Sequence, residues 1–338
     1  KSWMDKISKK TQMIKKRLDE LKKKFVLLGI DGYVVPKNDE FFSEYSQKDR
    51  LKIISNFTGS AGFAIILKKK NYLFVDGRYS IQAEIESGRF FKINKYEKLI
   101  NCQIFKNLTL GIDPKLFTPK QISNFFLKYN NIKEIELNLI DTIFNKYSIK
   151  SKPFFSLNQN IVGESHRNKI DRLTSILKRY KSNYIFITAP ENVAWLLNIR
   201  GNDSNYSPIP NSHLIINSKK KIYLFCEPNK IDKKFKQRLK NITFLNINFI
   251  DDFLDSISGK KIIVDNLTCS IHFKNILNKK NKIKQFTDPI YYFKSTKSKI
   301  EILNTKKVHE KDGAALTKFI FWVKNNYKKK RITEISAQ

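Results

Sequence analysis

Cysteine, histidine and methionine are rare in this chain. Its 338 residues include 3 cysteines, 4 histidines and 2 methionines. Cys102, Cys226 and Cys269 lie far apart and form no CxxC pair, which argues against a disulfide framework and a zinc knuckle and leaves buried thiols as the expectation. The histidines are equally scattered, without HExxH or any other metal-ligand spacing. The sequence therefore predicts no metal site in this chain.

Long apolar runs are also missing. No stretch approaches the roughly 18 uninterrupted apolar residues of a membrane span. The N-terminal segment is amphipathic and rich in lysine, without the apolar core of a signal peptide. We therefore expect a soluble, cytoplasmic protein with no membrane partner.

Acidic residues are scarce beside basic ones. The chain has 31 Asp and Glu against 65 Lys and Arg, a formal net charge of +34. Such a charge can serve nucleic acid or another polyanion. We favour coding bias as its origin, because the basic residues are mostly Lys and accompany many Asn, Ile, Phe and Tyr, whose codons are rich in A and T. The lysine runs also fall at helix ends or between apolar strands, where solvated turns are expected.

Apolar residues are plentiful and follow the periods of helices and strands. They make up 41% of the chain, enough to fold more than one domain. Helical spacing from Ile7 to Leu28 predicts a helix that ends at Gly29. A strand at 32–35, a hairpin at 62–75 and a strand at 108–113 follow.

The same order recurs later in the chain. A helix at 170–180, a strand at 184–187, a hairpin at 214–226 and a strand near 263–265 are predicted. Lys68–Phe74 and Lys219–Phe225 share the pattern KKKxYLF at a spacing of about 150 residues. We infer an α/β fold with two copies of one domain, residues 1–155 and 156–293, each with a mixed sheet flanked by helices.

A different pattern begins after the second copy. Residues 298–327 predict one long helix, and Thr333 followed by Glu334 is typical of the cap of another. A long helix with no domain to pack on leads us to expect that residues 294–338 begin a third domain.

The two copies differ at the end of the hairpin, and this difference yields the one candidate site residue. The first copy has Asp76-Gly-Arg-Tyr79, where the second has Glu227-Pro-Asn-Lys230. The guanidinium of Arg78 can present a planar fork to a carboxylate or carbonyl. The alternative is that Arg78 pairs with Asp76 or with the backbone.

Other polar segments have structural interpretations. Asn56–Gly62 lacks the spacing of a phosphate loop and predicts a tight connection into the hairpin. For Arg200–Asp203 we favour a polar turn over substrate contact. For Asp39, Glu40 and Glu44 we favour a solvated acidic loop over general acid–base catalysis. No Ser/His/Asp, Cys/His or paired-carboxylate arrangement stands out.

Three segments together resemble the three-domain Xaa-Pro aminopeptidases (aminopeptidase P) of the creatinase/prolidase superfamily. They are Phe57–Ile66 running to Val75–Tyr79, Ala194–Asp203, and His309–Leu316 with Ile332–Ala337. The resemblance implies two creatinase-like N-terminal domains before a pita-bread domain, whose two Mn²⁺ activate a water that cleaves the bond before proline. It places every metal ligand beyond Gln338. The third segment would be the entry helix of that domain, truncated before the ligands.

These implications define what we expect of this chain. It should have no catalytic residue, bind no Mn²⁺ and be inactive alone, and Arg78 should contact the peptide substrate. The complete enzyme should take Xaa-Pro peptides and form a homodimer through its catalytic domain, with no nucleic-acid partner. The alternatives are a non-catalytic creatinase-like binding protein and a polyanion-binding protein that uses its basic surface.

Overall fold

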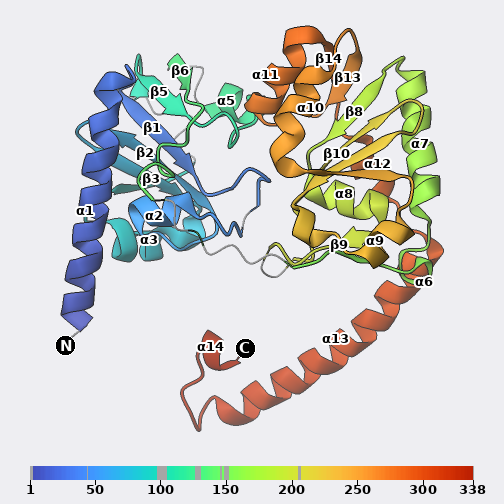
Figure 1. Cartoon of the computed structure of the whole chain (residues 1–338). Coiled ribbons are helices and arrows are strands. Elements are labelled where there is room, and N and C mark those ends of the chain that lie inside the picture. Colours follow the sequence, from blue (N-terminus) through green and yellow to red (C-terminus); the bar gives the residue numbers. More distant parts are fainter. Residues whose placement is uncertain are drawn as a thin grey trace.

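The computed structural model describes residues 3–43, 45–96, 105–125, 131–144, 147, 152–204 and 207–337, with backbone alone for 3–11 and 125. Cys102 and Glu44, singled out from the sequence, lie outside these residues. The described chain forms two α/β units side by side and one long helix that leaves the second unit (Figure 1).

Each unit is built on a six-stranded sheet, and the two sheets have the same topology. The first has the order β4-β3-β2-β1-β5-β6 and the second β12-β11-β10-β8-β13-β14. The first sheet contains β1 (Gly32–Pro36), β2 (Gly62–Leu67), β3 (Asn71–Val75), β4 (Lys92–Lys95), β5 (Thr109–Ile112) and β6 (Asn131–Glu134). The second contains β8 (Tyr184–Ile187), β10 (His213–Asn217), β11 (Ile222–Cys226), β12 (Ile242–Asn246), β13 (Lys261–Val264) and β14 (Lys282–Gln285).

Strand directions confirm the predicted repeat. β1 is antiparallel to β2 and parallel to β5. In the second sheet, β8 is likewise antiparallel to β10 and parallel to β13. Both sheets are therefore mixed, as expected from the two α/β copies, and the matching lysine runs occupy equivalent hairpin turns, β2 to β3 and β10 to β11.

Helices cover both faces of each sheet because side chains alternate along buried strands. In β1, Tyr33 and Val35 join one core cluster while Val34 joins the other. α1 (Trp3–Leu27), α2 (Arg50–Ser55) and α3 (Ser80–Ser87) pack on one face of the first sheet, and α5 (Pro119–Phe125) packs on the other. α7 (His166–Arg179), α8 (Pro190–Leu197), α9 (Lys233–Arg238) and α12 (Pro289–Ser295) cover one face of the second sheet, and α10 (Ile250–Ser256) and α11 (Ile271–Lys280) cover the other.

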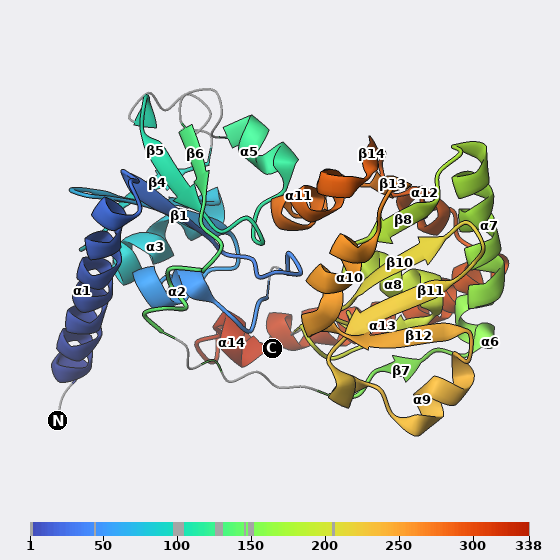
Figure 2. The same ribbon diagram turned by 45° about the horizontal axis from the view of Figure 1, so that its top comes forward.

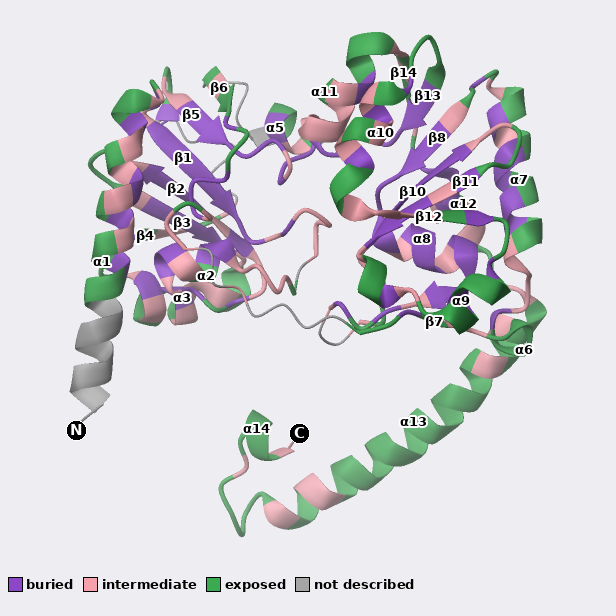
Figure 3. Ribbon diagram, in the orientation of Figure 1, coloured by how far each residue is buried: buried purple, intermediate pink, exposed green. Residues whose placement is uncertain are grey.

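α13 (Lys299–Asn326) extends away from both units. Ser298 and Glu301 form a capping box at its start, and Asn304 donates to the carbonyl oxygens of Asn160 and Ile161 in α6 (Gln159–Val162). None of its residues is buried, as Figure 3 shows. The predicted helix is confirmed, and α14 (Glu334–Ala337) follows at the predicted cap, where Thr333 Oγ1 accepts from Ser336 N. No described helix has both the length and the apolar character to cross a bilayer.

The two units are joined at the first turn of α11. The backbone N–H of Ile271 donates to Phe117 O at 2.9 Å, and that of His272 donates to Pro114 O at 3.1 Å. Both acceptors lie in the loop that follows β5, which faces α11 in Figure 2. The Ile271 side chain packs against an apolar core of the first unit. The helix start thus finds acceptors for its free N–H groups in the other unit.

An aromatic contact makes a second junction. Phe41, in the loop after β1, stacks on His213 of β10 with ring centroids 4.9 Å apart. His213 Nδ1 lies 3.1 Å from Thr188 O, so this nitrogen carries the proton of the neutral ring. Burial lowers the pKa of His213 to about 4.

Shortening Ile271 should loosen the junction between the units. In Ile271→Ala the apolar contact with the first unit is lost while the rest of α11 is unchanged. We expect small-angle scattering to show a larger radius of gyration than for the native chain. Leu267→Ala, at an exposed side chain next to the same helix, is the matched control. Scattering identical to the native chain in Ile271→Ala would show that the backbone hydrogen bonds suffice.

His213 should make the protein less stable as the pH falls. Between pH 6.5 and 4 the unfolded chain binds a proton at this imidazole that the folded protein does not, so the free energy of unfolding drops. Denaturant unfolding at pH 7 and at pH 4.5 measures how much of the free energy of unfolding is lost between the two. This loss should be about 2–3 kcal/mol smaller in His213→Phe than in the native chain, because phenylalanine keeps an aromatic ring but has no titrating nitrogen. Asp288, whose pKa burial raises to about 6, titrates in both proteins and cancels in this difference. Equal losses of unfolding free energy in the native chain and in His213→Phe would show that His213 does not cause the loss.

Candidate functional site

Arg78 lies on the surface at the end of β3, in a short 3₁₀ turn, Gly77–Tyr79. Asp76 Oδ1 accepts hydrogen bonds from the backbone N of Arg78 at 3.0 Å and from its Nε at 2.8 Å. These bonds, the side-chain one first, lower the pKa of Asp76. The Arg78 side chain is 70% exposed and lies over the Tyr79 ring. The pair foreseen as an alternative therefore exists, and it holds an exposed guanidinium in one orientation.

The segment before β2 supports this turn from beneath. Ser60 Oγ lies 2.9 Å from Tyr79 Oη, and the rings of Phe57 and Tyr79 meet edge to face. A Cβ on Gly59 would lie 2.3 Å from the Phe57 ring, so the close approach requires glycine here. Asn56–Gly62 is thus the tight connection predicted from the sequence.

The equivalent turn in the second unit holds a buried charge. Lys230 Nζ lies 2.9 Å from Asp203 Oδ1, and both side chains are almost completely buried. Asp203 Oδ2 also accepts from Asn211 N at 2.7 Å. Arg200 Nη1 donates to the carbonyl oxygens of Ala194 and Ile199. These internal contacts agree with the structural interpretation of Arg200–Asp203.

The acidic loop after β1 is not solvated as expected. Asp39 is only 6% exposed, its Oδ1 accepts from Phe41 N and Ser43 N, and burial raises its pKa. Burial alone would also raise the pKa of Glu40, but the charges of Arg50 and Lys48 lower it to about 2. Arg50 Nη2 lies 2.6 Å from Glu40 Oε1. The loop turns inward because Arg50 in α2 and the second unit provide its partners, which the sequence pattern did not indicate.

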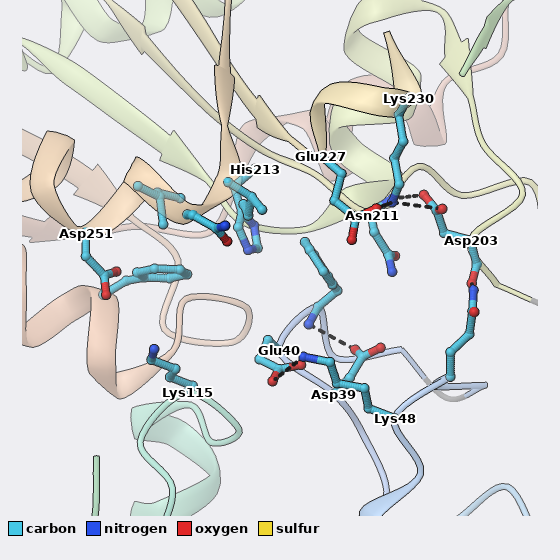
Figure 4. A pocket seen from close by; sticks show the side chains of 16 residues that line it. Asp39, Glu40, Lys48, Lys115, Asp203, Asn211, His213, Glu227, Lys230 and Asp251 are labelled. Carbon is cyan, nitrogen blue, oxygen red and sulfur yellow. Dashed lines mark hydrogen bonds and ion pairs between the residues drawn. The ribbon is translucent and has the colours of Figure 1, made fainter. Parts of the chain in front are cut away.

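A cavity of about 390 Å³ separates this loop from the second unit (Figure 4). Both units supply charged groups to its lining, together with the ring of His213. The charged side chains are Asp39, Glu40, Lys48 and Lys115 from the first unit and Asp203, Glu227, Lys230 and Asp251 from the second. No sequence pattern indicates this site, because its walls come from loops far apart in the chain.

The described side chains do not fit a two-metal centre. Among the residues with described placement, no group of three or more His, Cys, Asp or Glu is arranged to hold a metal ion. Cys226 and Cys269 are buried thiols, as predicted, and burial raises the pKa of each to about 12.

Two stretches of the chain match the creatinase/prolidase N-terminal domain family, residues 17–137 and residues 145–301. Among curated proteins, a probable Xaa-Pro aminopeptidase P of Laccaria bicolor is 28% identical over 91% of this chain and 51% of its own length. Xaa-Pro aminopeptidase 1 of Dictyostelium discoideum is also 28% identical, over 92% of this chain and 53% of its own length. The chain thus spans about half the length of these relatives.

A solved structure has the same arrangement of the two units. The X-prolyl aminopeptidase of Caenorhabditis elegans, described as a cytosolic enzyme with a di-nuclear active site, superposes with a TM-score of 0.85 at 24% identity. The match covers 96% of this chain and 58% of that one. The same family is indicated by the two tandem mixed-sheet units, by the two family matches and by the relatives. The chain therefore belongs to the creatinase/prolidase superfamily, with two creatinase N-terminal-like domains in tandem.

Proposed function

We propose that this chain is the N-terminal portion of a cytoplasmic Xaa-Pro aminopeptidase, which releases the residue that precedes proline at a peptide N-terminus. The observation that carries the proposal is the match of nearly the whole chain, in order, to Xaa-Pro aminopeptidases of which it spans half. The tandem domains and the exposed helix α13 support it, because relatives of twice this length have further chain to pack there.

We also propose which part of that enzyme each segment of the chain forms. Residues 1–155 and 156–293 are the two N-terminal domains, and 294–338 begin the catalytic domain. Two Mn²⁺ would bind to residues outside this chain, since the described side chains offer no ligand set. The chain alone is then inactive, and the complete enzyme dimerises through its catalytic domain. The lysine excess is general surface charge in this proposal, and the described runs 68–70 and 219–221 lie in exposed hairpin turns.

Arg78 is the residue we assign to substrate. Its guanidinium is exposed at a strand end, and Asp76 and the Tyr79 ring orient it. A guanidinium in this setting suits a peptide carbonyl or carboxylate. The equivalent Lys230 forms a buried ion pair with Asp203, so of the two equivalent turns only that of the first domain presents an exposed cation.

The activity itself can be tested directly. The complete protein loaded with Mn²⁺ should release the first residue from a peptide such as Arg-Pro-Pro, measured by mass spectrometry. This chain alone, with the same metal, should show no release above the blank. Failure of the complete, metal-loaded protein to cleave any Xaa-Pro peptide would overturn the enzyme and favour the non-catalytic binding protein.

Replacing Arg78 should separate substrate contact from folding. In the complete protein, Arg78→Ala should lower kcat/KM for Xaa-Pro peptides about tenfold or more, as expected for the loss of a charge-assisted hydrogen bond of ~1.5–3 kcal/mol. Bound metal and melting temperature should not change, because the Asp76 pair is exposed and contributes little to stability. Arg89→Ala, at another exposed arginine near α3, is the matched control. Native kinetics in Arg78→Ala would remove the assigned role.

A further inference from the structure

The cavity between the two domains has the size of a small-molecule site. Its volume of about 390 Å³ lies within the range of ligand pockets, roughly 300–1,000 Å³. The loop after β1 and the loop after β5 form one wall, and β10, the turn after β11 and α10 form the other. Phe41 and Phe273 add apolar surface beside the charged groups.

One end of the cavity carries an available cation. Lys115 comes from the first domain and lines the cavity close to Asp251 of the second (Figure 4). Asp251 is already engaged by His272 Nε2 at 2.8 Å. Among the described residues, no hydrogen bond or close ion pair of the Lys115 ammonium is found. The hydrogen bond from His272 and, after it, the charge of Lys115 lower the pKa of Asp251, and this charge can also attract an anionic group of a ligand.

The other end carries the Glu227 carboxylate, whose ion pair with Lys230 is long. Lys230 Nζ is bonded to Asp203 at 2.9 Å and lies 3.8 Å from Glu227 Oε2, too far for a hydrogen bond. The Glu227 side chain is 40% exposed and lines the cavity on the opposite side of His213 from Lys115 in Figure 4. Its carboxylate therefore keeps acceptor capacity for an ammonium group.

Between these charges lies a ring nitrogen of His213 that receives no hydrogen bond from a described residue. His213 is 3% exposed, and its Nδ1–H donates to Thr188 O, which leaves Nε2 as an acceptor. No described residue donates to Nε2. The rings of Phe41 and Phe273 pack against the imidazole at 4.9 and 5.2 Å and hold it in place. Because His213 lines the cavity, a ligand N–H there can donate to Nε2.

We propose that this cavity binds a short peptide with free ends, of dipeptide size. Its ammonium lies at Glu227, its carboxylate at Lys115, and its backbone N–H donates to His213 Nε2. The site is separate from the Arg78 turn and does not depend on the proposed peptidase activity. Because both domains form its walls, the peptide binds only their joined arrangement and stabilises it.

Titration calorimetry of this chain with glycylglycine tests the proposal. We expect saturable binding at neutral pH and low salt. N-acetyl-glycylglycine, which lacks the ammonium, and glycylglycinamide, which lacks the carboxylate, should each bind at least tenfold more weakly. Equal binding of the three compounds, or no binding at millimolar concentration, would overturn the proposal. Displacement of the dipeptide by equimolar inorganic phosphate would also overturn it, in favour of a simple anion site.

Variants locate the binding to the cavity. Glu227→Gln and Lys115→Gln should each weaken glycylglycine about tenfold, and His213→Phe about fivefold, since it keeps the aromatic stack and removes the acceptor. Glu310→Gln and Lys311→Gln on exposed α13 are matched controls that should bind as the native chain does. Far-ultraviolet circular dichroism confirms folding of each variant. Native affinity in all three cavity variants would place the binding elsewhere and overturn the assignment.

Discussion

The first turn of α11 joins the two domains, and the rest of the interdomain architecture depends on this junction. A helix start leaves N–H groups that its own backbone cannot satisfy. Here two of them donate to carbonyl oxygens of Pro114 and Phe117 in the first domain, and Ile271 enters an apolar core of that domain. Backbone hydrogen bonds are directional, so the junction sets how the sheets face each other. The stacking of Phe41 on His213 and the cavity beside it follow from that orientation.

The repeated domains show how one fold can place the same position in opposite environments. The turn after β3 and the turn after β11 occupy equivalent places in the two sheets. In the first, Asp76 is a local partner two residues away, and Arg78 remains on the surface. In the second, the partner is Asp203 from a distant segment, and Lys230 is drawn into the interior. The first domain therefore presents the cation of this turn on its surface, whereas the second domain buries it.

We propose that the metal chemistry lies outside these two domains, which is consistent with their described side chains. Their buried titratable groups are engaged in structural contacts, such as Asp203 with Lys230 and Glu40 with Arg50. Arg78 is exposed at a strand end, and Lys115 and Glu227 line the interdomain cavity. These are the groups through which we propose that the two domains bind peptides.

The sequence by itself determined the long amphipathic helices, the central strands and hairpins of both sheets, the repeat and the family. The spacing of apolar residues predicted α1, β1 and both hairpins, because a helix or strand that buries one face has apolar residues at its own structural period. The Asp76–Arg78 pair was also foreseeable, since its partners are two residues apart. The burial of Asp39 and the cavity around His213 were not, because their partners come from segments far along the chain. The spacing of residue types reflects only the helix or strand in which they lie. Which loops of the two domains meet was decided by the tertiary structure alone.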